Sequence, residues 1–72
     1  MTRQEMFDVT GYWNFVFCRE IKDLSDNTFC AFKHETDDSV AMYEDQKDGN
    51  FVMIGLYTYS KAMKLMNKMK VR

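Results

Sequence analysis

The sequence is poor in the residues that usually carry chemistry. It has one histidine, two cysteines and no proline in 72 residues, and it contains no Gly-x-Ser-x-Gly, His-Glu-x-x-His or phosphate-loop pattern. His34 has no evident partner, and the acid pairs Asp37-Asp38 and Glu44-Asp45 lack an apolar pocket that would separate their pKa values. We therefore expect no catalytic residues and a protein that is not an enzyme.

Metal and disulfide chemistry have little support. Cys18, Cys30 and His34 offer three ligands, but a structural zinc takes four and short Cys-x-x-Cys spacing is missing. We expect no metal and no cofactor, because two small buried cysteines explain the same residues. A disulfide between Cys18 and Cys30 stays open if they face each other across a hairpin in an oxidising compartment.

Long apolar runs are also missing. The run Tyr12–Cys18 is interrupted by Asn14, lacks a basic leader and is too short to span a bilayer. We expect no membrane segment and a cytoplasmic location, where both thiols stay reduced. The chain has no repeats, linkers or low-complexity tracts.

What is present suffices for one small domain, residues 1–72. Hydrophobic residues make up 46% and aromatic residues 15%, a globular rather than a disordered composition. A chain of this length buries only about 60% of its unfolded surface, so a stability of roughly 5 kcal/mol is expected. Seven methionines favour an adaptable core.

The net charge of −1 hides a division along the chain. Residues 59–72 carry five basic residues and no acid, whereas residues 1–58 carry all eleven acids and five bases. The near-zero total predicts no bulk attraction to nucleic acid or membrane. The division itself is the most informative electrostatic feature of the sequence.

The chain is organised around residues 48–69. Asp48-Gly49-Asn50 suits a tight hairpin, and Phe51–Tyr57 is apolar at even and odd positions, which predicts a strand covered on both faces. Ser60 can cap the helix that follows, predicted over Lys61–Lys70, and the apolar side of this helix should dock on a sheet.

The first half of the chain predicts a helix and a strand. Thr2-Arg3-Gln4-Glu5 has the form of a capping box and favours a short helix ending near residue 10, with a frayed terminus as an equal alternative. Tyr12–Arg19 is rich in aromatic and β-branched residues and predicts the first strand. A single helix over residues 3–23 also fits the apolar spacing, but Thr10-Gly11 and the dense aromatics favour the strand.

The middle of the chain completes the sheet. Ile21–Asn27 predicts a polar loop, and Thr28–Glu35 and Ser39–Asp45 predict two further strands joined by a turn at Thr36-Asp37-Asp38. Short loops imply antiparallel neighbours. The predicted fold class is therefore α+β: a three- or four-stranded antiparallel meander with the C-terminal amphipathic helix packed on one face, with or without a short N-terminal helix.

One helix about 10 Å wide cannot cover both faces of a sheet whose strands lie about 4.8 Å apart. The second face then needs the N-terminal segment, a second copy of the chain or another protein. If Trp13, Phe15 and Phe17 share a face with Val40 and Met42, the opposite face carries other aromatic residues. The predicted partner-binding aromatic face comprises Tyr12, Phe32 and Tyr43. The alternative is that a short Met6–Val9 helix covers this face and the tyrosines lie at its edge.

Charged residues suggest two further surfaces. An acidic rim would engage a protein with a basic surface and speed the encounter. This rim comprises Glu35, Asp37, Asp38, Glu44, Asp45 and Asp48. Alternatively, the basic side of the last helix could contact nucleic-acid phosphates, although many terminal helices display lysines opposite their apolar side. That basic side comprises Lys61, Lys64, Lys68 and Arg72.

In its general character the chain resembles the very small early proteins of bacterial viruses, including anti-defence inhibitors. The resemblance lies in short length, seven methionines, absent proline and an aromatic sheet followed by Ser60-Lys61-Ala62-Met63-Lys64. It implies a host-protein target and action in the host cytoplasm. The expected function is a small protein-binding inhibitor or adaptor that acts by occlusion, with a nucleic-acid-binding protein as the alternative.

Overall fold

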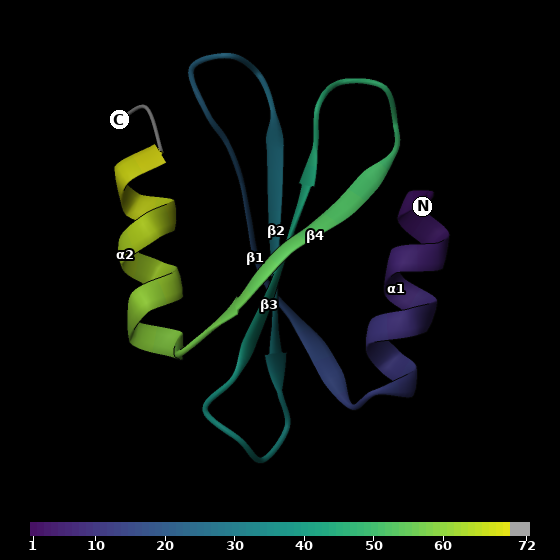
Figure 1. Cartoon of the computed structure of the whole chain (residues 1–72), viewed down its shortest axis with the longest axis vertical. Helices are drawn as coiled ribbons and strands as arrows, with labels where there is room; N and C mark the ends of the chain where they lie inside the picture. The colour runs from purple at the N-terminus through teal and green to yellow at the C-terminus, as the bar shows by residue number, and fades with distance from the viewer. Residues whose placement is uncertain (70–72) are drawn as a thin grey trace.

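Four antiparallel strands with a helix on each side make up the protein (Figure 1). The computed structural model describes residues 1–69. The elements are α1 (Arg3–Tyr12), β1 (Phe15–Lys22), β2 (Thr28–His34), β3 (Val40–Asp45), β4 (Phe51–Tyr57) and α2 (Tyr59–Met69). The strands follow one another in the order β1-β2-β3-β4, so the predicted α+β fold and its meander are confirmed, with four strands. Within residues 1–69, neither helix is long and apolar enough to cross a bilayer.

The N-terminal helix forms and carries the predicted capping box. The Thr2 hydroxyl accepts from the Glu5 amide at 3.2 Å, and the Glu5 carboxylate accepts from the Thr2 amide at 2.8 Å. These two bonds satisfy amides that the first turn leaves without a helical partner. The alternative of a frayed terminus is therefore wrong for this chain.

The boundary between α1 and β1 differs from the prediction. The helix continues through Gly11 to Tyr12, and Trp13 is its C-cap, so the strand starts at Phe15 rather than at Tyr12. Asn14 then reverses the chain with φ 66°, a left-handed conformation that asparagine tolerates better than most residues. Because its carbonyl accepts from the Glu35 amide at 3.0 Å, this reversal is fixed to the end of β2.

β1 also ends later than expected. Ile21 and Lys22 belong to the strand rather than to the predicted loop, and Ile21 is buried. The turn itself is organised by Asp23, whose carboxylate accepts from the Ser25 amide at 3.0 Å and the Asn27 amide at 2.9 Å. The next two strands lie within one residue of their predicted bounds.

The cap of α2 is not the predicted one. The Thr58 hydroxyl accepts from the Lys61 amide at 3.3 Å, and the Asp38 carboxylate accepts from the Tyr59 amide at 3.1 Å. The capping role predicted for Ser60 is therefore wrong, since Ser60 already lies inside the helix. The predicted last residue, Lys70, lies outside the described part of the chain.

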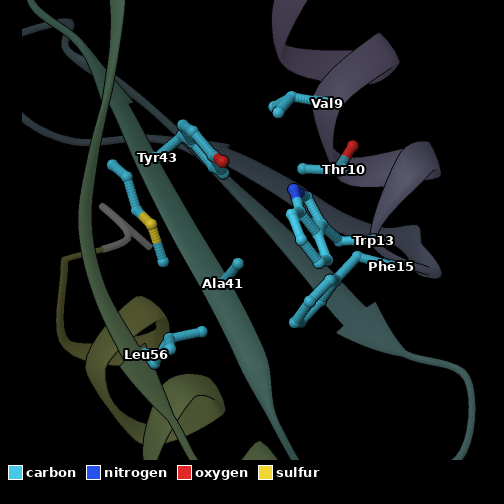
Figure 2. Close-up of a pocket in the computed structure, with 8 residues that line it drawn as sticks. Val9, Thr10, Trp13, Phe15, Ala41, Tyr43 and Leu56 are labelled. Atoms are coloured by element: carbon cyan, nitrogen blue, oxygen red, sulfur yellow. The ribbon is translucent and has the colours of Figure 1, made fainter.

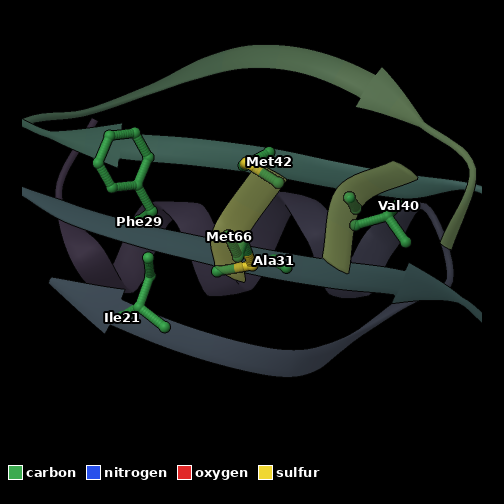
Figure 3. Close-up of a cluster of buried hydrophobic side chains, with 7 residues drawn as sticks. Ile21, Phe29, Ala31, Val40, Met42 and Met66 are labelled. Carbon is green, nitrogen blue, oxygen red and sulfur yellow. The ribbon is translucent and has the colours of Figure 1, made fainter. Parts of the chain in front are cut away.

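The face of the sheet beneath α2 carries an aliphatic core (Figure 3). Met66 and Ala62 of the helix pack on β2 and β3, as the predicted apolar side of this helix requires. This face has one aromatic residue among its buried members. The buried set comprises Ile21, Phe29, Ala31, Val40, Met42, Ala62 and Met66.

The opposite face, beneath α1, carries the aromatic core. Met6 is fully buried there, and Phe32 makes edge-on contacts with Phe7 at 5.2 Å, Phe17 at 5.7 Å and Tyr43 at 5.9 Å between ring centroids. The buried set comprises Met6, Cys30, Phe32, Ala41, Tyr43 and Phe51. The N-terminal helix, one of the three covers considered for the second face, packs on it.

The predicted division of side chains between the faces is wrong for β1. Phe17 stacks on Phe7 of α1 at 5.8 Å and Phe15 packs on the core beneath α1, whereas Val40 and Met42 lie beneath α2. Alternation within a strand fixes which of its residues share a face. It does not fix which of these sets lies on the same face as a given set of the neighbouring strand, which is the phase between the two strands. A bulge between Phe17 and Arg19 changes that phase again within β1.

Candidate protein-interaction surface

An apolar groove of about 310 Å³ lies on the α1 side of the sheet (Figure 2). The last turn of α1 forms one wall, β4 forms the other, and β3 is the floor. The groove exists because α1 packs chiefly on β1 and leaves Met53 and Leu56 of β4 exposed on this face. Its lining comprises Val9, Thr10, Trp13, Phe15, Ala41, Tyr43, Met53 and Leu56.

The apolar side chains on the two walls of the groove are unusually exposed. Trp13 is 62% exposed on the helix side and Leu56 is 61% exposed on the strand side. Ala41 on the floor is buried and has a small side chain, which leaves depth between the walls. Contiguous exposed apolar surface of this kind marks interaction sites, because covering it gains roughly 25 cal/mol for each Å² removed from water.

The polar groups of the groove are few. The Thr10 hydroxyl is already engaged, because it donates to the Met6 carbonyl at 2.8 Å. The Tyr43 hydroxyl points toward α1 across the groove (Figure 2), and burial raises the pKa of this phenol above its ordinary value. It therefore stays protonated as a hydrogen-bond donor at neutral pH. None of the lining side chains carries a formal charge.

The predicted aromatic face of Tyr12, Phe32 and Tyr43 does not exist as one exposed surface. Phe32 is 1% exposed and Tyr43 is 5% exposed, because α1 and its neighbours cover them. Tyr12 is 78% exposed, but it stands on α1 with its ring edge-on to Trp13 at 5.1 Å. The exposed apolar surface therefore lies at the groove and its rim, and not on the predicted face.

The predicted acidic rim is also wrong as a single surface. Glu35, Asp37 and Asp38 belong to the turn at one end of β3, and Glu44, Asp45 and Asp48 lie at the other end. The six residues of β3 separate the two groups by roughly 20 Å.

Three of these acids have local structural roles. Asp38 accepts from the first amide of α2. Asp45 accepts from the amides of Asp48 at 3.2 Å and Gly49 at 3.0 Å, and Asp48 accepts from the Asn50 amide at 2.9 Å. Helix capping therefore accounts for Asp38, and turn formation accounts for Asp45 and Asp48.

The basic side of α2 is present as far as the structure describes it. Lys61, Lys64 and Lys68 are exposed and share a shallow surface with Leu65 and Asn67. Within residues 1–69, none of the three lysines forms an ion pair. Arg72, the fourth predicted member, lies outside the described residues.

His34 has a structural environment. Its Nδ1 accepts from the amides of Thr36 at 3.2 Å and Asp37 at 3.1 Å, and Phe15 packs edge-on against its ring at 5.0 Å. Because Nδ1 acts as the acceptor, the ring proton resides on Nε2 in this arrangement. The ring thereby shapes the turn between β2 and β3.

The two cysteines lie on opposite faces of the sheet. Cys18 packs on the core beneath α2, Cys30 lies in the core beneath α1, and both are free thiols, so they do not form the disulfide that the sequence left open. Burial raises the pKa of the Cys30 thiol to about 11, which keeps it protonated and unreactive. Within residues 1–69, no cluster of three metal-ligating side chains is found.

Comparisons with protein-family models, with curated proteins and with solved structures gave no match to this chain. The groove must therefore be interpreted from its own chemistry. The sequence did not assign Trp13, Met53 and Leu56 to a site, although the uninterrupted apolar run of residues 51–57 contained the signal for the last two. Their exposure follows from how far α1 reaches across the sheet, which no local pattern encodes.

Proposed function

We propose that this protein is a small non-enzymatic protein-binding module, an inhibitor or adaptor that acts by occluding the surface it binds. The observation that supports this proposal best is the uncharged groove between α1 and β4, with Trp13 and Leu56 exposed on its two walls. Exposed tryptophan beside a concave apolar surface is typical of the energetic centre of protein interfaces.

The groove favours an apolar segment of the target. A side chain inserted above Ala41 would contact Trp13, Phe15 and Leu56 and displace water from all of them. Glu35 lies beside the groove, because its amide donates to the carbonyl of Asn14 between Trp13 and Phe15, but it is not part of the lining. Its charge would steer a target with a basic surface without forming the centre of the contact. The resemblance to early proteins of bacterial viruses makes a host defence or nucleic-acid-handling protein the target class of this proposal.

The test uses matched tryptophan and leucine variants. A target captured from candidate host cells would be purified, and its affinity for the intact chain measured by titration calorimetry. We expect Trp13→Ala to weaken binding about thirtyfold, the effect of losing roughly 2 kcal/mol at an interface centre. Leu24→Ala is the control, because Leu24 is 84% exposed in the turn between β1 and β2, away from the groove. Equal affinity for the Trp13 variant and the parent would refute the proposal.

Nucleic-acid binding through α2 is the second candidate. It is favoured by the three exposed lysines at positions 61, 64 and 68, which occur on the one helix that carries no acid. If this candidate is correct, replacing these three lysines by alanine abolishes binding to duplex or single-stranded oligonucleotides, and affinity falls steeply between low and moderate salt. Trp13→Ala leaves that binding unchanged, so the two candidates give opposite results with the same variants.

A further inference from the structure

The Tyr43 hydroxyl is a polar group that the protein buries without bonding it to the rest of the fold. Tyr43 is 5% exposed in β3, and its oxygen makes no hydrogen bond within residues 1–69. No side-chain nitrogen or oxygen in that part of the chain is fully buried without a partner, so the Tyr43 oxygen must reach open space. That space is the groove, which Tyr43 lines and across which its hydroxyl points toward α1 (Figure 2).

The ring of Tyr43 serves the fold, but its oxygen does not. The ring packs edge-on against Phe32 in the aromatic core at 5.9 Å between centroids, a contact that phenylalanine would make equally well. A hydroxyl in apolar surroundings costs free energy unless it is hydrogen-bonded. Water in the groove can supply that bond in the free protein, and a bound ligand with a suitable atom can replace the water.

Trp13 adds a second donor to the groove. Figure 2 shows its indole nitrogen at the end of the ring that is turned toward Tyr43, and this nitrogen makes no hydrogen bond in the described part of the chain. An indole N–H can only donate, and a protonated phenol has a hydrogen to donate as well. The hydrogen of the Thr10 hydroxyl is already used within α1. Two donors that face an apolar groove match an acceptor atom carried by an apolar group.

The charges around the groove disfavour an anionic acceptor. Glu35 lies beside it, and α1 ends there with the negative end of its dipole and no basic residue in its last turn. Two cations near the other end of α1 are already engaged, because the Met1 ammonium donates to the Phe51 carbonyl and Arg3 pairs with Glu20. A neutral amide carbonyl therefore fits these surroundings better than a carboxylate or a phosphate.

We propose that the groove takes an extended apolar peptide segment of the target, and that the Tyr43 hydroxyl and the Trp13 indole N–H donate to its backbone carbonyls. Carbonyls inside a helix already accept from their own backbone, whereas those of an extended segment are free to accept from a partner. The groove, at about 310 Å³, lies at the lower end of the range for ligand pockets and suits one or two residues. This inference rests on the proposed function, since it names the part of the target that the groove would bind.

A matched pair of tyrosine variants tests the proposal with a defined probe, N-acetyl-leucine N-methylamide, which is neutral and carries one apolar side chain and two amide carbonyls. NMR titration of the full chain should show saturable shifts of the Ala41 and Leu56 amides, with a Kd on the order of 1 mM for a molecule of this size. Tyr43→Phe should weaken binding about fivefold, the effect of losing one hydrogen bond. Tyr59→Phe is the control, because it removes the same atom from a residue of α2 that is 44% exposed.

Stability separates a binding role of the hydroxyl from a structural one. The urea midpoint of Tyr43→Phe should be no lower than that of the parent, because the oxygen makes no bond within the fold. A lower midpoint would show that the hydroxyl serves the fold and would overturn the proposal. Equal affinity of Tyr43→Phe and the parent for the probe would do the same, as would the absence of saturable shifts up to about 20 mM probe.

The second donor has its own signal. Trp13 is the one tryptophan of the chain, so its indole N–H gives a single NMR resonance, which should move downfield as the probe binds. N-acetyl-leucine, an anion at neutral pH, should bind at least about threefold more weakly than the neutral probe, because Glu35 and the end of α1 repel it. An unmoved indole resonance at saturation, or tighter binding of the anion, would overturn the assignment of a neutral carbonyl.

The captured target distinguishes this inference from the proposed function. If Trp13→Ala loses the target and Tyr43→Phe binds it as tightly as the parent, the groove is the binding site but the hydroxyl is not a donor in it. That result would overturn the inference and leave the proposed function intact. If neither variant weakens the target, both fail together.

Discussion

The two edges of the sheet have opposite designs. β1 exposes Val16 and Phe17, but it also carries Arg19, Glu20 and Lys22, and Glu20 is paired with Arg3 of α1 at 2.7 Å. β4 has exposed apolar residues on both sides and no charge. Both strands contain a bulge, so the bulge does not distinguish them. The charged residues of β1 and the position of α1 are what distinguish the two edges.

The difference teaches where a small protein can leave surface for interaction. α1 packs chiefly on β1 and on the aromatic core, and it leaves Met53 and Leu56 of β4 exposed beside the groove. An uncharged edge strand on a monomer favours aggregation. Such an edge is therefore expected in a protein where another chain covers it. The comparison therefore makes β4, rather than β1, the side on which the proposed partner would bind.

The largest expected effect comes from removing the anchor of α1. Met6 is fully buried beneath the helix, and Met6→Ala should lower the free energy of unfolding by about 2–5 kcal/mol, because it leaves a cavity between α1 and the sheet. Loss of this contact would expose the part of the sheet that α1 covers. Urea denaturation measures the loss, and increased binding of a fluorescent apolar dye should accompany it. A loss below about 1 kcal/mol would mean that α1 does not seal the aromatic core.

A second variant should make the two edges alike. Replacing Arg19 and Glu20 by valine in the Val52→Lys background removes charges from β1 and adds one to β4. We expect self-association to appear through β1, at a free-energy cost to folding of no more than about 1 kcal/mol for the exposed ion pair with Arg3. Sedimentation velocity detects the association. If the variant remained monomeric, charge would not be what protects β1.

The cap of α1 should have a smaller effect. Thr2→Ala removes the hydroxyl that accepts from the Glu5 amide and should cost about 1 kcal/mol. Thr2→Ser retains the oxygen and serves as the control. Both are measured by thermal or urea unfolding, and equal stability of the alanine variant and the parent would show that the capping box is not needed to hold the helix.

A further expected effect, confined to alkaline pH, is the loss of stability from Cys30. Its pKa rises from 9.0 to about 11 on folding because the thiol is buried. A raised pKa stabilises the fold fully below pH 9.0 and progressively less as pH climbs toward about 11. The parent should therefore lose more stability than Cys30→Ala over this interval, as urea unfolding at several pH values would show. Parallel pH profiles would contradict the burial of this thiol.

Much of the fold follows from local signals. The capping box at Thr2 and the apolar side of α2 each require only neighbouring residues, and both are present. The placement of the last three strands agrees for the same reason. By contrast, the left-handed Asn14 and the bulge after Phe17 set the phase of β1 through contacts with β2, so their effect on the faces was not predictable from alternation. The tight turn predicted at Asp48-Gly49-Asn50 is instead part of a five-residue loop, residues 46–50, with positive φ at Lys47 and Gly49.

The candidate site was predictable only in part. The surplus of apolar side chains on the second face correctly indicated an exposed apolar surface. Because α1 covers Phe32 and Tyr43, the exposed apolar residues are Trp13 and Leu56 instead. The acids illustrate the opposite error. They are neighbours in sequence, yet the six-residue strand β3 between the two turns places them at opposite ends of the sheet.

The most direct test of the account is the hydrogen exchange of the Met53 amide, measured by NMR at low and high protein concentration. If β4 is an edge that can pair with another copy of the chain, this amide should become at least about tenfold more protected as protein concentration rises, while exposed amides of β1 keep their rates. Protection of Met53 that does not change with concentration, or that rises equally on β1, would contradict the assignment of β4 as the side of the molecule that binds.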